Sequence, residues 1–151
     1  MPMKKEFLLD PLHGVGPVRF GMRRDDVLAA FGPPAASFYK TPDSRYPTDA
    51  WFESGFQVAY EGDEATVAFI ELSNDAGLEA FAFGLPVFAT PAAALVPAIE
   101  RHAELDRADP ELGYVYTFPD LELAFWRPDD DDDDTPYFAT VGIGRAGYYA
   151  A

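Results

Sequence analysis

The amino-acid sequence predicts an α+β protein in which two tandem repeats, each a helix with an antiparallel sheet, pack as one compact protein. Three observations lead to this prediction. First, 48% of the 151 residues are hydrophobic and 15% are aromatic, which is ample for a packed core. Second, residues 18–34 combine a strand end, a short amphipathic helix and a stop signal. Third, the same order of apolar positions returns 68 residues later, which is typical of an internal repeat.

The repeat divides the chain into three segments. Residues 1–13 lead into the fold, residues 14–73 form the first repeat and residues 84–146 form the second. Each repeat is expected to contain one helix followed by three antiparallel strands.

The first helix is predicted over residues 23–31. Val27, Leu28 and Phe31 lie on one side of such a helix, so we expect Leu28 and Phe31 in the core. Two aspartates in the first turn agree with the positive end of the helix dipole. Gly32 suits a left-handed C-terminal cap, and the two prolines that follow it prevent the helix from continuing.

Three strands are predicted after this helix. Residues 56–60 alternate apolar and polar side chains, residues 61–64 form a turn, and residues 65–73 complete a hairpin. Residues 50–54 supply the third strand. The connection 33–50 holds four prolines and three aromatic residues, and two interpretations of it stay open. It is a functional loop, or it is an extended strap that its aromatic side chains pin to the core.

The second helix is predicted to begin at Pro91, with Thr90 as its N-cap. We expect it to continue to about Ala108. Pro97 should kink this helix or split it in two, because proline lacks a backbone donor.

The strands of the second repeat follow from the same alternation of apolar residues. Residues 116–125 align with the strands of the first repeat and place Leu121, Leu123 and Phe125 on one inward face. Residues 137–145 then form the last strand.

The stretch around the first helix contains Gly21, Met22, Val27, Gly32 and Pro34. With these residues it resembles the opening of small bacterial modules of the SmpA/OmlA and beta-lactamase-inhibitor-protein-like (BLIP-like) type. The family usually carries threonine after its methionine, where this chain has Arg23. The resemblance implies short helices packed on an antiparallel sheet, and BLIP-like proteins bind partners through a concave sheet face. Outer-membrane members are lipoproteins, and this chain lacks the cysteine that would be lipidated.

The charge of the chain argues against one class of partner and favours another. The formal net charge is −15, and six of the negative charges lie in Asp129–Asp134. Such a surface repels nucleic-acid phosphates, so we expect no nucleic-acid partner. It attracts a basic protein. The alternative is that the charge only keeps the protein soluble.

Composition also bears on the compartment. No apolar run approaches the roughly 20 residues that span a bilayer, so no membrane partner is expected. The apolar patch Phe7–Leu9 is too short for the core of a signal peptide. The absence of cysteine excludes disulfides, thiolate nucleophiles and zinc–thiolate sites. Cytoplasmic residence is therefore expected.

Three motifs in the sequence resemble sites that bind a cofactor, bind a metal or catalyse a reaction. Residues 142–147 (GIGRAG) have the spacing of a dinucleotide-binding loop, but too few residues follow to form the required helix. The Asp129–Asp134 run lacks the glycine bend of a calcium loop and is predicted to be a solvated hairpin loop. His102 and Asp106 share one face of the predicted second helix, and we favour a surface hydrogen bond over base catalysis. No cofactor or metal is expected.

These observations favour a non-catalytic protein-binding role of the immunity or inhibitor type, with a basic protein as partner. They leave open a small-ligand-binding or enzymatic domain with a pocket between the halves, and a structural or assembly module. Tryptophan and tyrosine are favoured as interface anchors. For Trp51, Tyr60, Tyr116 and Trp126, burial in the core is the alternative interpretation. The candidate binding residues are Tyr39, Tyr46, Trp51, Tyr60, Tyr116 and Trp126.

Overall fold

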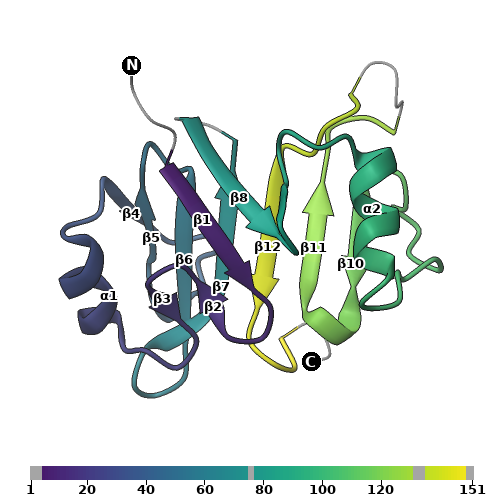
Figure 1. The fold of residues 1–151 in the computed structure, drawn as a ribbon. Coiled ribbons are helices and arrows are strands. Elements are labelled where there is room, and N and C mark those ends of the chain that lie inside the picture. Colours follow the sequence, from purple (N-terminus) through teal and green to yellow (C-terminus); the bar gives the residue numbers. More distant parts are fainter. Residues whose placement is uncertain (1–4, 75–76, 131–134, 149–151) are drawn as a thin grey trace.

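A computed structural model of the protein describes residues 5–74, 77–130 and 135–148. In chain order its elements are β1 (Lys5–Asp10), β2 (Gly14–Val15), β3 (Val18–Arg19), α1 (Arg24–Phe31), β4 (Ala36–Phe38), β5 (Thr48–Trp51), β6 (Phe56–Glu61), β7 (Thr66–Ser73), β8 (Leu78–Ala82), β9 (Leu85–Pro86), α2 (Ala92–Glu100), β10 (Val115–Phe118), the 3-10 turn η2 (Pro119–Leu121), β11 (Leu123–Trp126) and β12 (Thr140–Gly144). The described chain is an α+β protein, as predicted, in which most of the regular structure is strand (Figure 1).

The larger sheet joins two antiparallel meanders edge to edge. Its order is β10-β11-β12-β7-β6-β5-β4. β5, β6 and β7 form one meander, and β10, β11 and β12 form the other. They meet where β7 pairs with β12 in antiparallel fashion, with Ile70 opposite Ile143. The predicted hairpin of the first half is confirmed as β6 and β7, with bounds that differ by one residue.

The smaller sheet has the order β3-β2-β1-β8-β9, and sequence analysis did not anticipate it. Residues 5–10, expected as a lead-in, form β1 and pair in parallel with β8, so that Phe7 lies opposite Ala80. Phe7 and Leu9 are buried whereas Leu8 is exposed, which is the alternation of a half-buried strand. Parallel strands that are distant in the sequence are not joined by a tight turn, so no local signal in the sequence shows that β1 and β8 pair.

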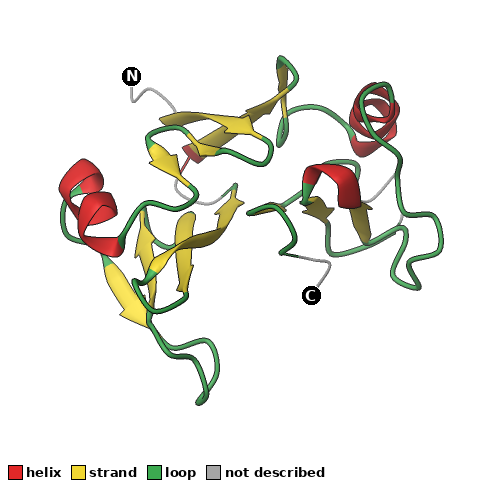
Figure 2. Cartoon of the chain, turned by 90° about the horizontal axis from the view of Figure 1, so that it is seen from below, coloured by secondary structure: helices red, strands yellow, loops and turns green. Residues whose placement is uncertain are grey.

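The smaller sheet and both helices lie on one face of the seven-stranded sheet (Figures 1 and 2). Alternate side chains of the larger sheet point into this layer, among them the fully buried Phe56, Ile70 and Phe125. They form one hydrophobic core with residues of the smaller sheet and of the helices. Neither helix described has the length and apolar character needed to cross a bilayer.

The first helix agrees with its predicted bounds to within one residue, but not with the predicted burial of Leu28 and Phe31 or with the left-handed cap at Gly32. α1 begins one residue later than expected and ends at Phe31, and Gly32 adopts a positive φ of 81° as the chain turns away. Val27 is fully buried. Leu28 and Phe31 pack against the core but are only partly buried, because α1 lies at one end of the sheet (Figure 1).

The second helix differs from its prediction at both ends. α2 ends at Glu100 rather than near Ala108, and its N-cap is Pro91 rather than Thr90. Of the two predicted effects of Pro97, splitting does not occur, because Pro97 lies inside α2. The missing donor of Pro97 is tolerated because buried side chains, Leu95 and Ile99 among them, hold the helix on both sides of the proline. The first amide of the helix, that of Ala92, donates to the carbonyl of Pro136.

Residues 116–125, which align in the sequence with two strands of the first repeat, lie in β10 and β11 and the turn between them. Pro119–Leu121 form the turn η2, and Glu122 follows with a left-handed φ of 50°. Leu121 therefore lies outside β11, although it still packs against the core, while Leu123 and Phe125 are fully buried as expected.

Candidate functional site

A buried carboxylate ties the first helix to the sheet. Asp49, on β5, has a fully buried side chain. The Arg24 guanidinium donates two hydrogen bonds to it, at 2.8 and 2.9 Å. Ser37 Oγ donates a third at 2.7 Å, and the Tyr60 hydroxyl donates a fourth at 2.8 Å. These contacts join α1, β4, β5 and β6 around one side chain.

The hydrogen bonds decide the charge state of this cluster. Burial acts to raise the pKa of the Asp49 carboxyl, but the hydrogen bonds from Arg24, Ser37 and Tyr60 outweigh it and hold that pKa below its usual value. Burial and the bond to Asp49 raise the pKa of Tyr60 far above its ordinary value. Asp49 is therefore ionised and Tyr60 neutral at neutral pH, and the carboxylate accepts four hydrogen bonds, so its role is structural.

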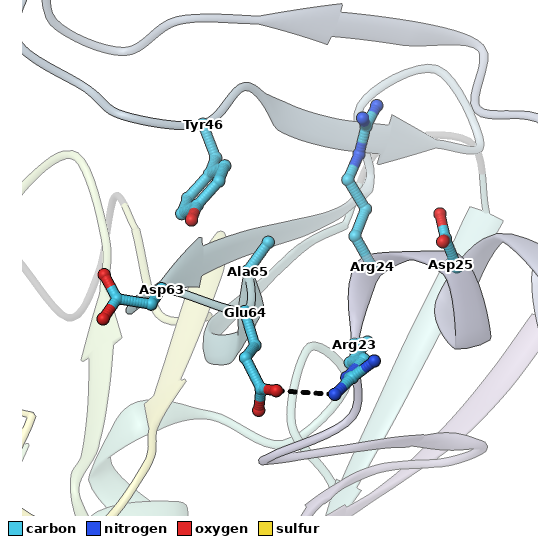
Figure 3. A pocket seen from close by; sticks show the side chains of 7 residues that line it. All are labelled: Arg23, Arg24, Asp25, Tyr46, Asp63, Glu64 and Ala65. Carbon is cyan, nitrogen blue, oxygen red and sulfur yellow. Dashed lines mark hydrogen bonds and ion pairs between the residues drawn. The ribbon is translucent and has the colours of Figure 1, made fainter.

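Two polar clefts share Tyr46, beside the turn between β6 and β7. Arginines neutralise the acids of this turn: Arg23 bonds Glu64 at 2.6 Å across the first cleft (Figure 3). Arg45 bonds Asp63 in the same way at 2.8 Å. The Tyr46 hydroxyl donates to the carbonyl of Gly62, which pins the connection 33–50 to the turn.

A third cleft lies at the other end of the seven-stranded sheet. It is lined by Pro110, Glu111, Tyr114, Val115, Trp126 and Pro128. Leu123 and Phe125 of β11 point into the core, so the alternation of the strand directs Trp126 to the opposite face, away from the helices. Trp126 is 43% exposed and Tyr114 is 42% exposed. Val115 lies directly opposite Trp126 across the β10–β11 pair.

A second aromatic ring on this face is covered by its own chain. Phe69 of β7 stacks with Tyr148, with ring centroids 4.8 Å apart. The ammonium of Lys40 lies 5.6 Å from the centroid of Phe69. Gly144 makes this stack possible, because a Cβ atom there would lie 2.6 Å from the Cβ of Tyr148.

A buried arginine fixes the backbone beside Trp126. Arg127 is 2% exposed, and its guanidinium donates to the carbonyls of Gly113 and Thr135, at 2.8 and 3.2 Å. It also donates to the Tyr116 hydroxyl at 3.2 Å. Arg127 thus ties the backbone at Gly113 and at Thr135 to the end of β11. The prediction of a solvated loop for Asp129–Asp134 lies largely outside the described residues, which omit 131–134.

The six aromatic residues predicted from the sequence do not form one surface. Trp51 and Tyr60 are 5% and 6% exposed, and the Trp51 indole donates to the carbonyl of Gly32 at 3.2 Å. Tyr46 and Tyr60 both line the second cleft. Tyr39 is 61% exposed, in the connection between β4 and β5.

The remaining two candidates lie at the other end of the sheet. Tyr116 is half-buried against Phe138, with ring centroids 5.5 Å apart, and Trp126 is exposed. Sequence reasoning missed Tyr114, the neighbour of Trp126 in the third cleft, because it follows a glycine in a segment with no alternation. It also missed Arg127, a single basic residue beside an acidic run.

The geometry does not support the pairing of His102 with Asp106 as a catalytic base. α2 ends before His102, so His102 and Asp106 do not share a helix, and the His102 ring stacks on Phe83 with centroids 4.1 Å apart. Within residues 5–74, 77–130 and 135–148, no three histidine or acidic side chains converge as metal ligands. No family of known proteins, no characterised protein and no solved structure matches this chain.

Proposed function

We propose that this protein is a small non-catalytic binding protein of the immunity or inhibitor type, and that its target is a basic protein. The observation that carries this proposal is the pair of exposed rings, Trp126 and Tyr114, in one cleft on the face of the sheet away from the helices. Large aromatic side chains supply most of the binding energy at protein interfaces. The net charge of −15 favours encounter with a basic surface.

The resemblance to BLIP-like modules agrees with this proposal, because those proteins bind partners through an open sheet face. We place the action of the protein in the cytoplasm, since small exported proteins commonly rely on disulfides and this chain has no cysteine.

We further propose that the two halves are tandem repeats. In support, each meander of the larger sheet follows a helix, and Val27 and Leu95, which align in the sequence, are both fully buried. In a crystal structure, the Cα atoms of residues 18–73 should superpose on those of residues 86–144 over the helix and three strands. A different strand order after superposition would contradict the repeat.

The test of the proposed function is affinity capture from the native host with three baits. The wild-type protein should retain a protein with an isoelectric point above about 9. Trp126→Ala should lose it, and Leu8→Ala, which removes an exposed apolar side chain elsewhere, should retain it. Association of the purified pair should slow severalfold between about 50 and 500 mM salt, while dissociation changes less. A metabolite that co-purifies with the wild type, with no protein captured, would instead favour a small-ligand-binding domain.

A further inference from the structure

We infer that the third cleft is a docking site for an arginine- or lysine-bearing segment of a protein, whose cationic side chain lies against the ring of Trp126. This inference rests on the proposed function and deepens it by assigning the partner chemistry to one site. The two aromatic rings, Val115 and two prolines give the cleft an apolar lining, and Glu111 gives it a carboxylate. Among aromatic rings the indole attracts a cation best, and a carboxylate in the same cleft adds a charge of opposite sign.

Hydrogen bonds within the chain fix the shape of the third cleft when no partner is bound. Trp126 and Val115 are fixed opposite each other by the β10–β11 pair. The amide of Arg127 donates to the carbonyl of Tyr114 at 2.9 Å, and the Arg127 side chain donates to the carbonyl of Gly113. Two aromatic side chains on a fixed backbone lose little conformational entropy on binding, which favours a partner that supplies the flexible side chain.

The charges around the cleft select a cationic occupant. Glu111 is exposed and Asp130 lies against Gly113, next to Tyr114. The nearby positive charge, on Arg127, is buried and donates to carbonyls and a hydroxyl of its own chain. An acidic segment would therefore meet repulsion at this cleft, whereas a basic segment meets attraction. A second copy of this chain, also at −15, is disfavoured for the same reason.

The covered ring of Phe69, compared with the exposed ring of Trp126, supports a cationic occupant of the third cleft. On the same face of the sheet, Phe69 is already covered by Tyr148 and by the ammonium of Lys40. The chain thus places one of its own cations over one aromatic ring of this face. Trp126 keeps 43% of its surface exposed, and a cation from a partner would cover it in the corresponding way.

The experiment is a titration of the ¹⁵N-labelled full chain with an octapeptide of alternating glycine and arginine. The chain has two tryptophans, so two indole N–H signals serve as reporters, and Trp51 is the buried internal control. We expect the Trp126 signal to shift and the Trp51 signal to stay. Trp126→Ala should raise the Kd about tenfold and Glu111→Gln about threefold, with Leu8→Ala unchanged. An alternating glycine–glutamate peptide should produce no shift.

Three outcomes would overturn the inference, and a fourth would overturn the proposed function alone. Equal peptide affinity for wild type and Trp126→Ala, each with a native circular dichroism spectrum, would mean that the peptide binds acidic residues without using the cleft. A concentration-dependent dimer that Trp126→Ala abolishes would assign the cleft to a second copy. A basic protein captured equally by wild type and Trp126→Ala would remove this site and, with it, the observation that carries the proposed function. A shift of the Trp126 signal without a captured protein would keep the site and remove the immunity or inhibitor role.

Discussion

Removal of the Asp49 carboxylate should destabilise the protein by about 3 kcal/mol, the lower end of the range for breaking a buried ion pair. The lower end of the range applies because the three residues that donate to Asp49 differ in their access to water. The side chain of Arg24 is 33% exposed and can turn towards water, and Ser37 is exposed as well. The hydroxyl of Tyr60, a residue 6% exposed, stays buried without its acceptor, which costs about 1–3 kcal/mol.

Urea denaturation of a double-mutant cycle measures this effect. Asp49→Ala, Arg24→Met and the double variant should show a coupling free energy of about 1–3 kcal/mol, because the second substitution removes a group that the first left unpaired. For a chain of this size, about 3 kcal/mol corresponds to a fall in Tm of roughly 6–12 °C. Asp63→Ala is the control: the Asp63 side chain is 95% exposed, so its loss should change stability by less than about 0.5 kcal/mol. Additive single substitutions would refute the view that Asp49 and Arg24 stabilise the fold as a pair.

Three further predictions follow from the same structure. Since the hydrogen bonds lower the pKa of Asp49 on folding, its contribution should be complete above the unfolded pKa of about 3.9 and lost as pH falls below it; Asp49→Asn should flatten that part of a stability–pH curve measured by urea titration. Phe31→Ala should destabilise by about 2 kcal/mol, below the usual range for a fully buried phenylalanine, and an unchanged denaturation midpoint would show that Phe31 does not stabilise the core. Gly144→Ala should displace Tyr148 and lower stability by about 1 kcal/mol, an effect that should vanish in a Tyr148→Ala background.

Local signals in the sequence were enough to predict α1 and the β6–β7 hairpin. Gly32 and the prolines after it mark the end of the helix, and residues 61–64 mark a turn between two alternating strands. The prediction failed where the deciding contact is distant. β1 is recognisable only once β8 is placed beside it. α2 ends at Glu100, and no glycine or proline in the next four residues marks that end.

The candidate sites show the same division. Residue type alone identified Trp126 as a possible anchor, because tryptophan is enriched at interfaces. It also selected Trp51 and Tyr60, which the fold buries, since the sequence does not reveal which face of a strand is covered. The Asp49 cluster draws side chains from α1, β4, β5 and β6, so no spacing in the sequence marks it.

The junction between β7 and β12 sets the order in which the chain can complete its sheet. Ile70 pairs with Ile143. The edge of β7 that pairs with β12 therefore has no hydrogen-bond partner until nearly the whole second half of the chain has been synthesised. Contacts of such sequence separation slow folding, because the loop between them must close first. A chain that stops before Thr140 leaves the backbone groups of β7 open along that edge. Open edges of this kind recruit strands from other chains, so C-terminal truncation should turn this protein into one that self-associates.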